Sequence, residues 1–219
     1  MDQDLPTRPY DHDDDLIRTA RDEQTSRVRV YGWPDVAVVI GRGGKQALEF
    51  HRESIIEDDV TVYKRSGGGC SVVLDPGNLI ISSGLPLPGV GGITSAFNAI
   101  SNWIIKCLDD SGVPGVTRQG ISDLTIGEKK IGGSCIYRTK GVLYYSTTLL
   151  VDHEQALVDR YLKHPPREPE YRQGRDHRRF MTSLAAEGLT PDPAYWLNRL
   201  EGVLQARLAQ LAETVGCPL

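Results

Sequence analysis

A run of three glycines at residues 67–69 lies just after Arg65 and leads into Cys70. Residues without a Cβ let the main chain approach a ligand closely and turn its N–H groups toward an anion. The guanidinium of Arg65 adds positive charge beside them. Strand-like runs come before the glycines, at residues 59–63, and after them, at 71–74. This combination favours a binding loop for a small acidic ligand over a flexible surface turn.

A second cluster occupies residues 123–135, where Lys129 and Lys130 lie in a tight turn that leads to a run of small residues. An ammonium packed against a glycine main chain can neutralise a carboxylate and an α-phosphate together, as the activation of an acid by a nucleotide requires. Two lysines alone are more typical of a solvated hairpin turn. Their pairing with the glycine loop favours the functional interpretation.

The elements that must position these clusters are strands mixed with helices. Residues 36–40 form a continuous apolar run, which predicts a strand buried on both faces. A helix is expected at about residues 45–56, before a hairpin that carries the glycines. Further strands are predicted at 27–33, 78–84, 124–126, 132–137 and 142–151, and helices at 94–111, 154–162 and 193–213. Because strict βα alternation is missing, we predict an α+β fold with mixed, largely antiparallel sheets flanked by helices.

Composition narrows the class of protein. The 219 residues are 39% hydrophobic and 25% charged, which is ordinary for a soluble globular protein. No apolar run reaches the length of a membrane span, and the start lacks a signal peptide, so we expect a cytoplasmic protein without membrane contact. The net charge of −4 argues against a nucleic-acid binder. Four widely separated cysteines predict reduced thiols and no zinc site.

Four ordered motifs then identify a family. The segments 38–42, 65–78, 122–124 and 130–134 resemble, in order and approximate spacing, those of the lipoate–protein ligases. Those enzymes share the biotin/lipoate ligase catalytic fold with octanoyl and lipoyl transferases. The resemblance implies a ligase-like catalytic domain over residues 28–184, between a polar, helical N-terminal extension (1–27) and a helical C-terminal extension (185–219). Such a chain is a compact member, without a full C-terminal accessory domain.

The resemblance also implies a reaction. Lipoate, or octanoate, and ATP with Mg²⁺ would give an acyl-AMP and pyrophosphate, and the acyl group would pass to a lysine of a lipoyl carrier domain. Lys130 corresponds to the catalytic lysine that touches the acyl carboxylate and the α-phosphate, and Asp123 resembles an aspartate near the adenine or the metal. The residues implied to bind ATP or lipoyl-AMP are Arg65, Gly67, Gly68, Gly69, Cys70, Ser71, Val72, Asn78, Asp123, Lys130, Gly133 and Ser134. Those expected to wall the acyl tunnel are Val39, Gly41, Val72 and Val73.

Two other functions stay open at this point. An ATP-independent octanoyl or lipoyl transferase would use a cysteine thioester, and Cys70 and Cys135 both follow the small residues of the expected site. The cysteine of the known transferases lies in a loop equivalent to residues 115–120, which contain none here, so the ligase is favoured. The other possibility is a non-catalytic lipoate-binding subunit, or a chain that needs an accessory subunit.

Two local departures from the family pattern limit the transfer of residue roles. Tyrosines 144 and 145 stand where the family often has histidine, and one extra residue after the glycines leaves open which of Cys70 and Ser71 faces the ligand. A basic stretch at residues 160–179 carries seven Lys or Arg against three Asp or Glu. It is either a solvated connector or a docking surface for an acidic carrier domain.

Overall fold

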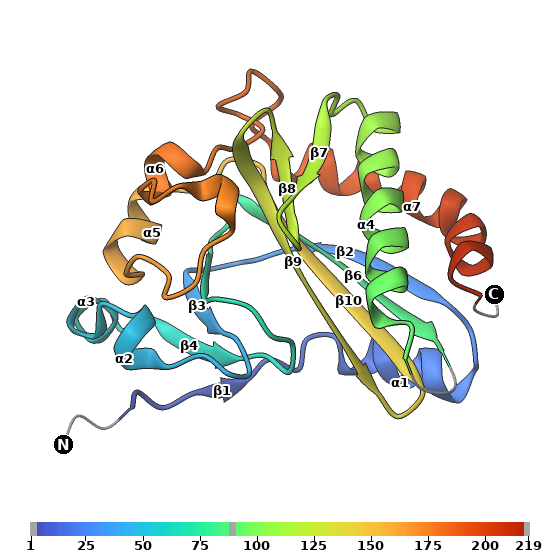
Figure 1. Ribbon diagram of the computed structural model, residues 1–219, viewed down its shortest axis with the longest axis horizontal. Coiled ribbons are helices and arrows are strands. Elements are labelled where there is room, and N and C mark those ends of the chain that lie inside the picture. The colour runs from blue at the N-terminus through green and yellow to red at the C-terminus, as the bar shows by residue number, and fades with distance from the viewer. Residues whose placement is uncertain (1–3, 88–90, 217–219) are drawn as a thin grey trace.

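A six-stranded antiparallel sheet forms the centre of the computed structural model, which describes residues 4–87 and 91–216 (Figure 1). Every pairing in this sheet is antiparallel, as the sequence predicted for most of the fold. Its strands, in spatial order, are β2 (Arg27–Gly32), β6 (Asn78–Pro86), β10 (Val142–Leu150), β9 (Lys129–Thr139), β8 (Asp123–Ile126) and β7 (Val116–Gln119).

Two long helices, α4 (Ile93–Asp110) and α7 (Pro193–Val215), cover one face of this sheet (Figure 1). Alternation along β10 separates the two faces. Tyr145 points into the main core, where its ring lies 5.6 Å from that of Phe97, whereas Tyr144 points to the opposite face. The large sheet therefore has one face in the core and one face free to build a site.

A smaller, mixed sheet lies beside that second face. Its strands, in spatial order, are β1 (Arg8–Pro9), β4 (Thr61–Lys64), β3 (Ala37–Ile40) and β5 (Val72–Leu74). Strand β3 pairs in parallel with β4 and antiparallel with β5, and all four of its residues are buried, which confirms the strand predicted to be buried on both faces. The two sheets with their helices confirm the α+β class.

The predicted glycine hairpin is wrong, because the strands on either side of the glycines do not pair with each other. Strand β3 lies between β4 and β5, so the glycine loop crosses the end of β3 to join two strands that are not neighbours. The buried apolar residues of β3 need partners on both edges, and this demand outweighs local pairing.

The single helix predicted at residues 45–56 is also wrong. Two short helices, α2 (Gln46–Glu49) and α3 (Arg52–Glu57), are separated by Phe50, whose main chain is extended and whose side chain is fully buried. Phe50 forms a bridge with Leu162, just after α5 (Gln155–Tyr161). Burying the phenyl ring there brings the main chain out of the helix.

Helix α1 (Asp14–Asp22) packs on the free face of the large sheet, and a buried carboxylate secures its start. Asp13 is 3% exposed, and its Oδ2 accepts hydrogen bonds from Tyr31 (3.0 Å), Ser82 (2.8 Å) and Tyr144 (2.5 Å). Its Oδ1 accepts one from Arg29 Nη2 at 2.7 Å. These donors come from β2, β6 and β10, so a single side chain ties the N-terminal segment to three strands.

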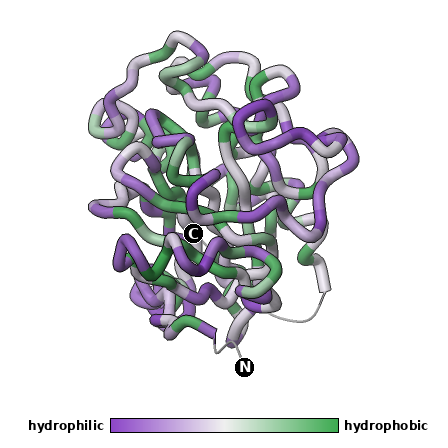
Figure 2. Tube along the Cα trace, turned by 90° about the vertical axis from the view of Figure 1, so that its left-hand side faces the viewer, coloured by the Kyte–Doolittle hydropathy of each residue, from purple (hydrophilic) through white to green (hydrophobic). Residues whose placement is uncertain are grey.

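The division of the chain at residues 27 and 184 stays a prediction. In the structure α1 contacts β6, and α7 contacts α4 and β2, so both terminal segments pack on the central body. Among the described residues no helix is long and apolar enough to span a membrane, and Figure 2 shows only short hydrophobic stretches between hydrophilic ones.

We predict that Asp13→Ala lowers the free energy of unfolding by about 3 kcal/mol, because it removes a buried carboxylate that accepts from the half-buried Arg29 and from three hydroxyls. Urea denaturation followed by circular dichroism measures this loss. Asp14→Ala, which removes an exposed carboxylate of the same helix start, is the control and should cost less than about 1 kcal/mol. Equal losses in the two variants would contradict the anchoring role.

Candidate functional site

A cavity of about 1010 Å³ lies where the two sheets face each other. Residues 65–74 form one wall, from the glycine loop into β5, and β8 and β9 supply Asp123, Lys130 and Gly133 opposite. Residues 165–170 close a third side. The structure thus brings the predicted lysine and the glycine loop to one cavity.

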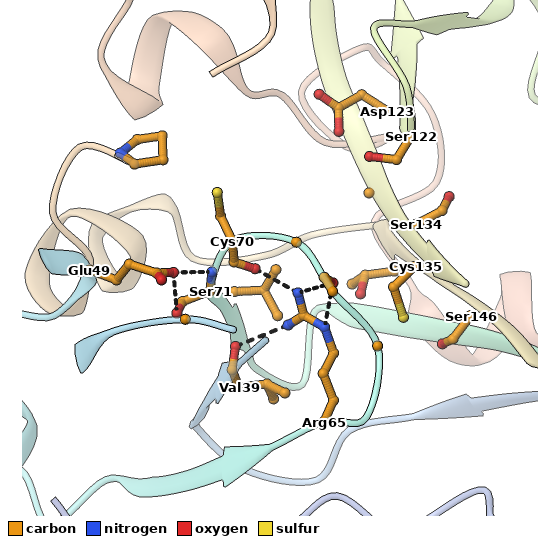
Figure 3. Close-up of a pocket in the computed structure, with 18 of the residues that line it drawn as sticks. Val39, Glu49, Arg65, Cys70, Ser71, Ser122, Asp123, Ser134, Cys135 and Ser146 are labelled. Atoms are coloured by element: carbon orange, nitrogen blue, oxygen red, sulfur yellow. Dashed lines mark hydrogen bonds between the residues drawn. The ribbon is translucent and has the colours of Figure 1, made fainter. Parts of the chain in front are cut away.

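Arg65 shapes the glycine loop through hydrogen bonds to main-chain carbonyl oxygens. Its Nη2 donates to the carbonyl oxygens of Cys70 (2.7 Å) and Gly68 (2.9 Å), and its Nη1 donates to that of Val39 (3.2 Å) (Figure 3). Because these carbonyls are bound to the guanidinium, the side chain fixes the path of the loop. Its positive charge also stays beside the loop, where the sequence predicted it.

Gly69 and Gly41 let the loop pass close to β3. Gly69 has a φ of +96°, which is costly for residues with a side chain, and a Cβ at Gly41 would lie 2.1 Å from the carbonyl oxygen of Gly69. Gly41 is not among the residues that line the cavity. It was expected as a tunnel wall, and the structure places it behind the loop, where it allows the close approach.

Glu49 holds the other end of the loop. Its Oε2 accepts hydrogen bonds from the main-chain N–H and the hydroxyl of Ser71, both at 2.7 Å (Figure 3). Its Oε1 accepts one from the N–H of Lys45 at 3.1 Å. Cys70 and Ser71 both line the cavity, but the polar groups of Ser71 are turned to Glu49.

A buried carboxylate connects Lys130 to the basic stretch. Asp123 Oδ1 lies 2.8 Å from Lys130 Nζ, and Asp123 Oδ2 accepts a hydrogen bond of 2.8 Å from the hydroxyl of Tyr171. The ammonium also lies close to Gly133, where a Cβ would come within 2.9 Å of Nζ. Burial and the charge of Asp123 raise the pKa of Tyr171 above its usual range, so this hydroxyl stays protonated and donates.

The basic stretch is tied to the β8–β9 hairpin through hydrogen bonds to main-chain carbonyls. Arg175 donates to the carbonyl oxygens of Tyr171 (2.7 Å) and Glu128 (3.2 Å), and Arg172 Nε donates to that of Arg175 (2.9 Å). These two arginines hold the stretch in place. Arg167, by contrast, is exposed at the cavity wall.

Asn78 builds a turn outside the cavity lining. Its Nδ2 donates to Asp75 Oδ1 at 2.5 Å, and Asp75 Oδ2 accepts from the N–H of Glu154 at 2.7 Å. Asn78 is 1% exposed and is not among the lining residues. Asn78 was expected to bind the nucleotide, but in the structure its turn connects the start of β6 to Glu154, the residue before α5.

The remaining expected wall residues, Val39, Val72 and Val73, do line the cavity, as does Ser134. On the free face of the large sheet, Gly133, Cys135 and Tyr137 follow one another along β9 over about 13 Å. Lys130, Asp13 and Tyr144 line the same cavity.

The two thiols at the site are not activated. The sulfur of Cys135 packs against Gly67, where a Cβ would come within 2.8 Å, and burial raises the pKa of this thiol. Burial, followed by the charge of Glu49, also raises the pKa of Cys70. A nucleophilic cysteine needs the opposite shift.

Sequence reasoning missed four residues of the site: Asp13, Glu49, Tyr171 and Arg172. Asp13 and Glu49 lie far along the chain from the groups that they contact. Tyr171 and Arg172 lie in the basic stretch, which the sequence indicated as a solvated connector or a docking surface and did not connect with Asp123 or the cavity. The density of acids at the start of the chain was noticed, but nothing in the sequence singled out Asp13 as the buried one.

We predict that Cys135 reacts with iodoacetamide at pH 8 at least roughly tenfold more slowly than the same cysteine in unfolded protein, because its raised pKa reduces the thiolate fraction. The rate should climb as the pH rises beyond the usual thiol range. Peptide mass spectrometry of timed samples measures it, with Cys135→Ser as the blank. Fast labelling of the folded protein at pH 7 would contradict the assignment.

Comparison with known proteins shows which family this chain resembles. The model of the lipoyl protein ligase A/B catalytic domain matches residues 6–200. A curated relative from Mycoplasma genitalium, "Probable lipoate-protein ligase A", is 31% identical over 134 residues, which are 61% of this chain and 39% of that protein. The chain thus spans about two fifths of the length of this relative.

Solved structures show the same fold. A bi-partite lipoate protein ligase from Thermoplasma acidophilum, studied with its E2 lipoyl domain, has a TM-score of 0.71 at 19% identity, covering 96% of this chain and 89% of that one. A lipoate-protein ligase A bound with ATP has a TM-score of 0.73 at 20% identity, covering 98% and 85%. With the family model matched over most of its length, the chain belongs to the lipoyl protein ligase A/B catalytic-domain family.

Proposed function

We propose that the protein is an ATP-dependent lipoate–protein ligase, which activates lipoate or octanoate as an acyl-AMP and transfers the acyl group to a lysine of a carrier domain. The observation that carries this proposal is the ammonium of Lys130, held by Asp123 on the wall of the cavity that the glycine loop also lines. The family membership and the ATP-bound neighbour support it.

In the first step, a carboxylate oxygen of the acid attacks the α-phosphorus of ATP, and the bond to the pyrophosphate oxygen breaks. Negative charge is concentrated where two anions must meet, so a cation at that point lowers the barrier. Lys130 provides it, and the adjacent Gly133 leaves room for the ammonium beside the main chain of β9. The N–H groups of the glycine loop are the expected partners of the phosphate oxygens.

Magnesium would enter with the nucleotide. Mg²⁺ at such sites is held mostly by phosphate oxygens, water and one or two carboxylates, and Asp123 is the lining carboxylate that lies beside Lys130. Both of its oxygens have hydrogen-bonding partners in the structure. The ion would therefore replace or share one of those contacts.

In the second step, the neutral amine of the carrier lysine attacks the acyl carbonyl. A C–N bond forms, the bond from the carbonyl carbon to the phosphate oxygen breaks, and AMP leaves as the amine gives up a proton. Exposed basic residues border the cavity, Arg42 and Arg167 among them, and suit an acidic carrier surface. The Thermoplasma neighbour was studied with a lipoyl domain, which supports a partner of this kind.

The thioester route of a transferase has less support. Neither Cys70 nor Cys135 is near a group that lowers its pKa enough to offset burial. A separate accessory subunit stays one of the alternatives that the sequence left open.

We predict that Lys130→Ala lowers the rate of lipoate-dependent ATP–pyrophosphate exchange by about 10²–10³-fold, because the charge that stabilises the transition state is lost. Lys129→Ala removes the neighbouring lysine, which is exposed and does not line the cavity, and should retain most of the rate. Near-normal exchange in Lys130→Ala would remove this residue from catalysis.

A double variant, Cys70→Ser with Cys135→Ser, should retain ATP-dependent acylation of an apo lipoyl domain within about threefold, since the ligase uses no thioester. Intact mass spectrometry of the carrier after incubation with lipoate and MgATP gives the readout. Acylation by wild-type protein from an acyl-carrier donor without ATP, lost in the double variant, would establish the transferase instead.

A further inference from the structure

Arg172 is a buried arginine, and one nitrogen of its guanidinium has no hydrogen-bond partner in the described part of the chain. The residue is 4% exposed, Nε donates to the carbonyl oxygen of Arg175 at 2.9 Å, and the guanidinium lies 4.6 Å from the ring centre of Phe180. Its Nη2 is buried without a hydrogen-bond partner among the described residues. A buried N–H left unpaired costs free energy, and such groups are rare unless a ligand completes them.

The charge of Arg172 is also incompletely balanced. The nearest carboxylate is that of Glu168, whose Oε2 lies 3.5 Å from Arg172 Nε and only 2.9 Å from His164. Its other oxygen accepts from the N–H of Gly174 at 2.9 Å. Asp123, the next acidic group, is engaged by Lys130 and Tyr171. Burial accordingly lowers the pKa of Arg172 despite these acids.

The side chain lines the same cavity as Lys130 and the glycine loop. Arg172 follows closely on residues 165–170, which close the third side of that cavity. The preceding residue, Tyr171, is the hydroxyl donor to Asp123, so the short helix η1 (Glu170–Arg172) sends two consecutive side chains to the site.

We propose that Arg172 binds the phosphate groups of the nucleotide, with Nη2 donating to a phosphate oxygen. This inference rests on the proposed ATP-dependent function. The guanidinium presents parallel N–H groups that match phosphate oxygens, and it stays charged when buried, as an ammonium does less readily. A phosphate would supply both the missing acceptor and the missing negative charge. The acyl chain would supply neither, the base and ribose of the nucleotide carry no charge, and the carboxylate of the acid is already the proposed partner of Lys130.

The test compares ATP with adenosine, because only the first carries the group that Arg172 is proposed to bind. Arg172→Gln should raise the dissociation constant for MgATP, measured by isothermal titration calorimetry, by about 10- to 100-fold while leaving that for adenosine within about threefold. The rise in melting temperature that MgATP causes should shrink in parallel. Both measurements are independent of catalytic turnover.

Arg178→Gln is the matched control. Arg178 belongs to the same basic stretch, is exposed beside Asp159, and does not line the cavity. The Arg178→Gln substitution removes the same formal charge, and the dissociation constant of this variant for MgATP should stay within about threefold of the wild-type value. Equal weakening in the two variants would mean that general basic charge attracts the nucleotide, which would overturn the role of Arg172.

A merely structural role predicts a different pattern, in which Arg172→Gln weakens ATP and adenosine equally or leaves ATP binding unchanged. Either result overturns the inference. If Arg172→Gln fails to fold, Arg172→Lys keeps the charge without the planar fork, and an undiminished affinity for MgATP in that folded variant overturns it as well. Wild-type protein that binds no MgATP would refute the proposed function itself, together with this inference.

Discussion

The carboxylate of Asp123 is the contact on which the site depends. One oxygen holds the ammonium of Lys130 and the other accepts from Tyr171, so a single buried group joins the β8–β9 hairpin to the basic stretch. Without this acid, the ammonium of Lys130 and the hydroxyl of Tyr171 would lose the partner that they share. The position of the lysine is therefore a property of the tertiary structure as well as of its strand.

The glycine loop shows the complementary arrangement. Arg65 donates hydrogen bonds to carbonyl oxygens of the loop, and Glu49 accepts them from the N–H and the hydroxyl of Ser71. A cationic side chain thus binds main-chain acceptors, and an anionic one binds a main-chain donor. A segment rich in glycine loses much conformational entropy when it becomes ordered, and these contacts offset that loss before a ligand arrives. The loop is thus shaped in advance, although glycine is the most flexible of residues.

Much of this could be predicted from the sequence, and the limits have physical causes. The α+β class, the buried strand β3 and the meeting of Lys130 with the glycine loop followed from hydrophobic pattern and ordered motifs. A glycine in a motif, however, can face a ligand or another main chain, and Gly41 does the second. Asp13 and Arg172 were missed because burial of a charge is decided by segments distant in sequence, which no local pattern reveals.

The passage of the loop over β3 has a consequence for folding. In the described part of the chain, β4 and β5 each pair with β3 and not with each other, so the loop between them reaches its final path when all three strands have assembled. Contacts of this kind form late in folding, because the entropy cost of closing the chain comes before the strand pairing that offsets it. A molecule that binds the loop therefore stabilises the smaller sheet in particular. Slower exchange of the amide hydrogens of β3 and β5 would show this stabilisation most clearly.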